Sequence, residues 1–187
     1  MEISNLLGDS FILLNLQDVN IKEEIPEDLP TLEENARFKA KYIYTATGMN
    51  VFADDTGLEI EALNGRPGVL SARFAGAHKD FSANTEKVLS LMTGERNRSA
   101  KFRTVIALIL NGSEYIFEGT VSGNIINEKR GTGGFGYDPI FVPEGNELTF
   151  AEMSLNEKNK ISHRAQAFEK LKLFLSQNTP PDNKAIN

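Results

Sequence analysis

The segment VFADDTGLEIEAL, residues 51–63, runs from an apolar start into two adjacent carboxylates, a threonine and a glycine. No Lys or Arg stands beside Asp54 or Asp55 in the sequence to neutralise them. Asp and Gly commonly end strands in turns, and Asp55 or Thr56 could cap the local backbone. The alternative is a site for a divalent cation, to which other parts of the chain must contribute ligands.

The residues on either side of the aspartates favour strands. Leu58, Ile60 and Ala62 alternate with glutamates, which is the pattern of a half-buried strand. Residues 51–53 form a shorter apolar strand before it, and Thr56-Gly57 allows a turn between the two. The paired carboxylates are therefore expected at a strand end.

The segment TLEENARFKAKYIYTATG, residues 31–48, predicts a helix that leads into this strand. Apolar or small residues recur in it with a helical period, Thr31 suits the N-cap and Gly48 the stop. Glu34 stands three residues after Thr31, which is the spacing of a capping box. A short crossover from helix to strand could instead bring Glu34 to the same end of the sheet as the paired aspartates.

The remaining patterns complete the expected fold. Asn111-Gly112 between two apolar segments is typical of a β-hairpin. Because helices alternate with strands early and a hairpin comes later, we expect an α/β fold with a mixed sheet flanked by helices. The other expected elements are a helix ending at Gly8, a strand near 11–16, a helix capped by Ser82 and reaching about 93, a short strand at 140–142, and a helix from about 163, capped by Ser162, with Ala165, Phe168, Leu171 and Leu175 on one face.

The composition is that of a soluble globular protein. The 187 residues are 40% hydrophobic and 25% charged, and we expect one domain over residues 1–176 and a disordered tail over 177–187. The lack of cysteine excludes disulfides and thiolate chemistry, and two histidines argue against a multi-histidine metal site. A net charge of −6 argues against a nucleic acid as partner. Without a signal peptide or a long apolar run, we expect no membrane association and a cytoplasmic location.

Carboxylates gathered without histidine or cysteine are hard oxygen ligands. Such ligands suit Mg²⁺, which binds one or two carboxylates, several waters and the phosphates of a substrate. Along an extended strand Asp54 and Asp55 face opposite sides, so at most one of them would bind the metal directly unless the strand has turned.

The segment GTGGFG, residues 131–136, matches the pattern G-x-G-x-x-G. It leads into a strand and not into a helix, so it is not a dinucleotide-binding fingerprint, and the chain has no G-K-[ST] of a P-loop. A plain double turn is one interpretation. The other is a flexible flap whose Phe135 or Tyr137 stacks on a flat ring.

Residues 162–164 read S-H-R at the start of a helix. Positive charge there opposes the helix dipole, a cost that a solvated helix face would tolerate. Together with Lys158, however, His163 and Arg164 would form a cationic, donor-rich cluster that suits a phosphate or a carbonyl-bearing base. The acidic site, the aromatic flap and this cluster together indicate a nucleotide pocket with a metal.

Four segments occur in the order and spacing of a known family. They are TLEENARFKAKYIYTATG (31–48), VFADDTGLEIEALNGRPGVLSARFAG (51–76), GGFGYDPIFVPEG (133–145) and TFAEMSLNEKNKISHRAQAF (149–168). On these segments the chain resembles the inosine triphosphate pyrophosphatases, also called XTP/dITP diphosphohydrolases, over about residues 8–175. The resemblance implies an elongated α/β fold, a homodimer, and Mg²⁺-dependent hydrolysis of purine nucleoside triphosphates with a 6-keto group to the monophosphate and pyrophosphate.

The resemblance also implies roles for individual residues. Glu34 and Asp55 would hold Mg²⁺, and Asp55 would accept the proton of the attacking water with Asp54 in support. Thr56 stands where many relatives have serine, a change that keeps the hydroxyl. The residues that would line the nucleotide site are Thr56, Phe135, Gly136, Tyr137, Asp138, Lys158, His163 and Arg164.

One segment of the family pattern is not found in the chain. Family members begin with a strand and a phosphate-binding loop of the pattern T-[GN]-N-x-x-K, and Met1 corresponds to the helix after that loop. We therefore expect the natural protein to begin upstream. An alternative function is a non-catalytic nucleotide-binding or dimer-scaffold protein that has lost this loop. The Maf-type nucleotide pyrophosphatases are an enzymatic alternative, against which the S-H-R cluster and the flap favour the inosine-type pocket.

Overall fold

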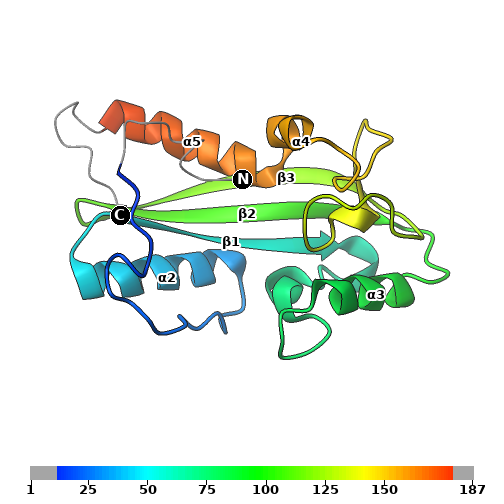
Figure 1. Cartoon of the computed structure of the whole chain (residues 1–187), viewed down its shortest axis with the longest axis horizontal. Helices are drawn as coiled ribbons and strands as arrows, with labels where there is room; N and C mark the ends of the chain where they lie inside the picture. Colours follow the sequence, from blue (N-terminus) through cyan, green and yellow to red (C-terminus); the bar gives the residue numbers. More distant parts are fainter. Residues whose placement is uncertain (1–11, 179–187) are drawn as a thin grey trace. The chain divides into compact units, whose positions relative to one another are not determined.

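The computed structural model describes residues 12–178 (Figure 1). The predicted helix ending at Gly8 and residues 179–187 of the predicted tail lie outside this range. The helices and strands, in chain order, are α2 (Leu32–Thr47), β1 (Val51–Ile60), α3 (Phe81–Leu91), β2 (Ser99–Leu110), β3 (Ser113–Ile125), β4 (Phe141–Pro143), α4 (Leu155–Ile161) and α5 (His163–Asn178). Three short 3₁₀ helices, η1 (Glu61–Leu63), η2 (Gly68–Arg73) and η3 (Asp138–Ile140), complete the order.

Strand β1 is continuous through the two aspartates. The predicted turn at Thr56-Gly57 is wrong, because all ten residues of Val51–Ile60 are in extended conformation. A glycine in a strand marks a turn only where its backbone leaves the extended region, and Gly57 is not among the glycines with positive φ. Asp54 and Asp55 therefore point to opposite faces of the sheet.

The sheet has the strand order β1-β2-β3-β4. Strands β2 and β3 are joined at Asn111 and Gly112, whose φ angles of 51° and 80° are the positive values that a type I′ hairpin requires. Strand β4 pairs antiparallel with β3, with Ile125 opposite Phe141. The α/β class with flanking helices is confirmed, but the four described strands form an antiparallel sheet and not the expected mixed one.

The expected mixed sheet depended partly on a strand near residues 11–16. From residue 12 onward that segment holds only an isolated bridge at Ile12 and a turn over residues 16–20. The side chain of Asn15 explains the turn, because its Oδ1 accepts hydrogen bonds from the backbone N–H groups of Gln17 and Asp18 at 2.9 and 3.1 Å. An asparagine that bonds its own backbone in this way competes with strand pairing.

The described residues divide into two compact units, which we call unit 1 and unit 2. Unit 1 comprises residues 12–55, Thr104–Gly119 and 165–178, and unit 2 comprises Thr56–Arg103 and Thr120–Arg164. Each unit has its own hydrophobic core.

In unit 1, strand β2 is buried on both faces from Thr104 to Leu110. Ile106, Leu108 and Leu110 share one face and pack against the apolar side of α5. Figure 1 shows α2 and α5 on opposite sides of the strands, which explains why the alternate residues of β2 are buried as well. The face of α5 predicted from sequence is confirmed, since its members Ala165, Phe168, Leu171 and Leu175 are all buried.

Helix α2 begins and ends as predicted. Thr31 is its N-cap and accepts a hydrogen bond from the backbone N–H of Glu34, while Gly48 closes the helix in the left-handed conformation with φ of 67°. Leu32, Ala36, Ala40 and Ile43 form its buried face.

In unit 2, the core joins residues of β1, β2, β3 and β4 to helix α3. Helix α3 is capped by Asp80, whose side chain accepts a hydrogen bond from Ala83 N, and not by the predicted Ser82. Helix α4 was not predicted; Ser154 and Glu157 form its capping box. The sequence before residue 163 is too polar to show a helical period, so only this capping pattern could have revealed α4.

Candidate functional site

Asp55 does have a positive partner, supplied by a distant part of the chain. The Lys39 Nζ atom, from helix α2, lies 3.6 Å from Asp55 Oδ1. The same ammonium donates hydrogen bonds to Glu27 Oε1 at 2.8 Å and to the backbone oxygen of Asp54 at 2.7 Å. The aspartates therefore lack a neutralising cation only among their neighbours in sequence. We call Glu27, Lys39 and Asp55 the acid–lysine cluster.

The acid–lysine cluster is only partly open to solvent. The side chains of Lys39 and Asp55 are 13% and 15% exposed, and that of Glu27 is 28% exposed. Sequence reasoning missed both Glu27 and Lys39. The signal that could have found Lys39 is its place on α2, on the helix that was already expected to approach the end of the first strand.

Glu34 contacts the N-cap Thr31, but its carboxylate bonds the Thr31 hydroxyl and not the backbone N–H that a full capping box requires. The Glu34 Oε2 atom accepts a hydrogen bond from Thr31 Oγ1 at 2.8 Å. The backbone N–H of Glu34 donates to Thr31 Oγ1 at 3.1 Å. The neighbouring Glu33 pairs with Arg37 one turn later at 2.9 Å. Within residues 12–178, no group of three or more Asp, Glu or His side chains is arranged to hold a metal ion.

In unit 2, Asp138 connects the glycine-rich loop to helix α4. It is 3% exposed, forms an ion pair with Lys158, and its Oδ2 accepts a hydrogen bond from the backbone N–H of Phe135 at 2.8 Å. A Cβ on Gly134 would lie 2.0 Å from that same oxygen. The loop therefore needs glycine at 134 because the Asp138 carboxylate occupies the space of a side chain.

The two aromatic residues of the loop have different surroundings. Phe135 is 59% exposed, and Lys158 Nζ lies 5.2 Å from its ring centroid. Tyr137 is buried, its hydroxyl donates to the backbone oxygen of Ser71 at 2.9 Å, and burial raises its pKa. Of the two predicted stacking residues, only Phe135 has an exposed ring.

His163 is neutral and not part of a cationic cluster as the sequence suggested. It is 7% exposed and stacks on Phe102 with a centroid distance of 4.6 Å and an interplanar angle of 10°. Burial, reinforced by the positive charges of Lys158 and Arg164, lowers its pKa to about 3. Its buried Nδ1 forms no hydrogen bond with any described residue. The positive charge of this region therefore comes from Lys158 and Arg164.

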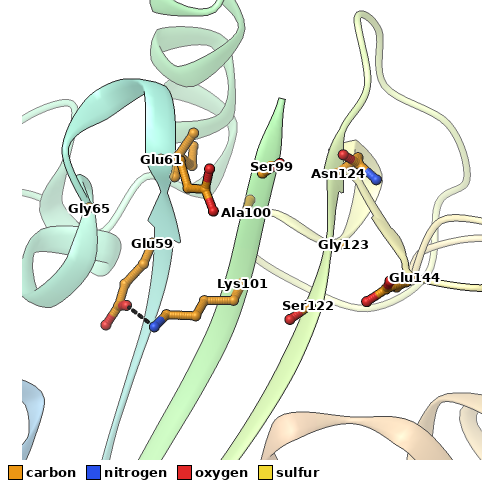
Figure 2. Close-up of a pocket in the computed structure, with 11 residues that line it drawn as sticks. Glu59, Glu61, Gly65, Ser99, Ala100, Lys101, Ser122, Gly123, Asn124 and Glu144 are labelled. Carbon is orange, nitrogen blue, oxygen red and sulfur yellow. Dashed lines mark ion pairs between the residues drawn. The ribbon is translucent and has the colours of Figure 1, made fainter. Parts of the chain in front are cut away.

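Among the described residues, unit 2 has a pocket that the predicted Phe135 and Gly136 line and another that no predicted site residue lines. A pocket of about 300 Å³ lies between the glycine-rich loop and the first turn of α3, and its lining includes Phe81, Thr85, Phe135 and Gly136. A pocket of about 410 Å³ is lined by residues of β1, β2 and β3 (Figure 2). There Glu59 is already paired with Lys101 at 3.1 Å, so we assign no function to this second pocket.

These features define a class of protein. An α/β fold with an exposed aromatic residue beside a lysine, a buried neutral imidazole and a set of carboxylate oxygens is suited to processing a nucleotide. Searches for similar proteins agree with this assignment. The chain belongs to the Ham1 family, because a sequence profile of that family matches residues 1–174.

Several relatives are similar over most of the chain. The dITP/XTP pyrophosphatase of Flavobacterium johnsoniae is 50% identical over 170 residues, which are 91% of this chain and 88% of that protein. The dITP/XTP pyrophosphatase of Bacillus subtilis is 49% identical over 164 residues, 86% of this chain and 83% of that protein. The solved structure of the Staphylococcus aureus Ham1 protein has a TM-score of 0.89 at 38% identity and covers 94% of this chain and 92% of its own. The predicted family and fold are thereby confirmed.

Proposed function

We propose that this protein hydrolyses inosine and xanthosine (deoxy)nucleoside triphosphates to the monophosphate and pyrophosphate, and so removes non-standard purines from the nucleotide pool. Its relatives at about 50% identity are named dITP/XTP pyrophosphatases, which supports the reaction. The observation that carries the proposal is the exposed Phe135, whose backbone N–H is held by Asp138 and whose ring lies beside the ammonium of Lys158. The flat ring of a purine can stack on Phe135 while hydrogen-bond donors of the pocket bind the edge of the purine.

Selection for a 6-keto purine follows from the protonation of these groups. Lys158 and Arg164 offer only donors, and a neutral His163 offers one donor and one acceptor. The O6 of hypoxanthine or xanthine accepts hydrogen bonds from such donors. Adenine carries an amino group at that position and would leave them unsatisfied, which is how a polar pocket rejects a molecule of nearly the same shape. Gly136, Tyr137 and Asp138 would hold the loop that carries Phe135.

The acid–lysine cluster offers two carboxylates, those of Glu27 and Asp55, to a divalent cation that a substrate phosphate and water would also bind. All its acceptors are oxygens, and the ammonium of Lys39 already occupies a cation position that faces both Glu27 and Asp55. We assign Asp55 as a ligand of Mg²⁺, with Glu27 as its partner because Glu34, the residue implied by the resemblance, is engaged with Thr31. Bound Mg²⁺ would neutralise the triphosphate and polarise the phosphoryl group under attack.

The residues around this cation position supply the rest of the chemistry. Asp55 accepts the proton of the attacking water as general base. Lys39 holds Asp55 through its carboxylate and Asp54 through its backbone oxygen, which fixes this part of β1. Thr56 follows Asp55 directly and contributes a hydroxyl to the substrate.

Pyrophosphate release tests the proposal. The purified protein is assayed with ITP, XTP, dITP and ATP, with Mg²⁺ and with EDTA. We expect release that needs the metal and is at least about tenfold faster for ITP or XTP than for ATP, the discrimination expected when donors are left unpaired. Equal rates for ATP and ITP would contradict the base selection. Binding of ITP without any turnover would favour the non-catalytic alternative.

We propose further that the protein is a cytoplasmic homodimer, as the resemblance implies. None of the helices within residues 12–178 is long and apolar enough to cross a membrane. Light scattering on the eluate of a sizing column measures the mass, and a single peak at the mass of one chain would contradict the dimer.

A further inference from the structure

The first residue of helix α3, Phe81, is a large apolar side chain with 46% of its surface exposed. The helix does not need it, because Asp80 caps the N-terminus and the buried side chains of α3 are Asn84, Thr85 and Val88. Its contact is with the loop: the centroids of the Phe81 and Phe135 rings are 6.2 Å apart at an interplanar angle of 51°. Tilted aromatic pairs at this separation attract one another.

The backbone around Phe135 is held from two sides. The N–H of Phe135 donates to Asp138 Oδ2 at 2.8 Å, and the carbonyl oxygen of Gly136 accepts from Thr85 Oγ1, on α3, at 3.2 Å. Thr85 is buried, and its single hydroxyl hydrogen is shared with the backbone oxygen of Phe81, 2.8 Å away. Because the backbone is fixed, what stays variable at Phe135 is the orientation of its ring.

Two groups restrict that ring. Lys158 Nζ lies 5.2 Å from its centroid, and Phe81 lies beside it on the wall of the 300 Å³ pocket. Lys158 is committed to Asp138 and 14% exposed, so its position is set by that pair. Phe81, which is uncharged, is then the remaining contact that can set the angle of the Phe135 ring.

We propose that Phe81 is a positioning residue, which holds the ring of Phe135 in the orientation that stacks on the purine. This inference rests on the proposed function and adds to it a residue that acts through the ring of Phe135. A ring that is held in place before binding loses less side-chain freedom when the purine arrives. Phe81 therefore strengthens substrate binding and leaves the chemical step unchanged.

Steady-state kinetics with ITP give the first test. Phe81→Ala should raise KM by about three- to tenfold and leave kcat within about twofold. The change in KM corresponds to the entropy lost when one freed aromatic side chain is ordered again on binding. Phe81→Tyr should restore the KM of the wild type. The matched control is Leu91→Ala, at the other end of α3 with 42% exposure, which should change neither constant. A fall in kcat as large as the rise in KM would assign Phe81 a merely structural role. A lower Tm for F81A than for L91A would do the same.

A second measurement does not depend on catalysis. The chain contains no tryptophan, so Phe135→Trp introduces one tryptophan at the loop, which can be excited at a longer wavelength than the tyrosines. Adding F81A to F135W should shift the emission maximum of the introduced tryptophan and change its quenching by iodide in the absence of any nucleotide. It should also raise the concentration of inosine monophosphate needed for half-maximal quenching by about three- to tenfold. If the wild type hydrolyses no ITP but these spectra change, the proposed function fails and the positioning role stands. Unchanged spectra and unchanged quenching would overturn the role of Phe81.

Discussion

The two lysine–carboxylate clusters differ in how their lysine is held. In unit 2, Lys158 pairs with Asp138, whose side chain is 4% exposed, and the ammonium also lies 5.1 Å from the ring centroid of Phe150. In unit 1, Lys39 is shared among three oxygen acceptors, and its 3.6 Å distance to Asp55 is near the limit of an ion pair. The comparison indicates that Lys158 fixes the structure of a loop, whereas the carboxylates around Lys39 are held more loosely and can bind a second cation beside it.

The largest expected effect concerns the chemistry of unit 1. Asp55→Asn keeps the size of the side chain but removes its charge and its ability to accept a proton. Turnover of ITP should fall by about 10²- to 10⁴-fold while Tm stays within a few degrees. Asp54→Asn is the matched neighbour and should lose less, because its contact with Lys39 is made by the backbone. Activity of D55N within about tenfold of the wild type would remove Asp55 as the base.

The second prediction compares the stability of the two clusters. Asp138→Ala leaves the ammonium of Lys158 without its buried partner and removes the acceptor for Phe135 N–H, and should lower the free energy of unfolding by about 3–5 kcal/mol. Lys39→Met leaves carboxylates that are partly exposed to solvent, so its cost should be about half of that or less. Urea denaturation of both variants measures the difference. Equal costs would show that both lysines have the same structural role.

The third prediction uses pH to test the neutral imidazole of His163. Its pKa is about 3 in the folded protein and close to 6.5 when unfolded. Between these values the unfolded chain binds a proton that the folded chain does not. The free energy of unfolding should therefore fall as pH drops below 6.5, by up to about 1.4 kcal/mol per pH unit.

His163→Gln removes this titration and serves as the comparison. The stability advantage of the wild type over H163Q should shrink as pH is lowered from 7 to 5, as measured by urea denaturation at each pH. An advantage that stays constant over this range would contradict a buried, neutral His163.

The smallest expected effect separates two glutamates in unit 1. Glu27→Gln should raise the Mg²⁺ concentration needed for half-maximal activity by about tenfold or more. Removing a group that only orients a metal ligand already lowers metal affinity by about tenfold, and Glu27 is proposed as a ligand itself. Glu34→Gln can still bond Thr31 and should change neither the metal dependence nor Tm. The reverse result would make Glu34 the metal ligand and would assign Glu27 to the support of Lys39.

Several parts of the fold could be predicted because they depend on local geometry. The caps Thr31 and Gly48 and the hairpin at Asn111-Gly112 follow from residue types that suit particular backbone angles. Predictions failed where a segment satisfied more than one local pattern. Thr56-Gly57 allows a turn as well as a strand, and either Asp80 or Ser82 could have capped α3.

The sequence by itself determined the chemical types at the candidate site: adjacent carboxylates, an aromatic residue among glycines, and a histidine between Lys158 and Arg164. Only the tertiary structure decided which charges meet. Lys39 neutralises Asp55 although the two are sixteen positions apart in the sequence, and His163 is neutral although its neighbours in sequence suggested a cation. The reason is that charge interactions depend on distance and burial, and a linear pattern specifies neither.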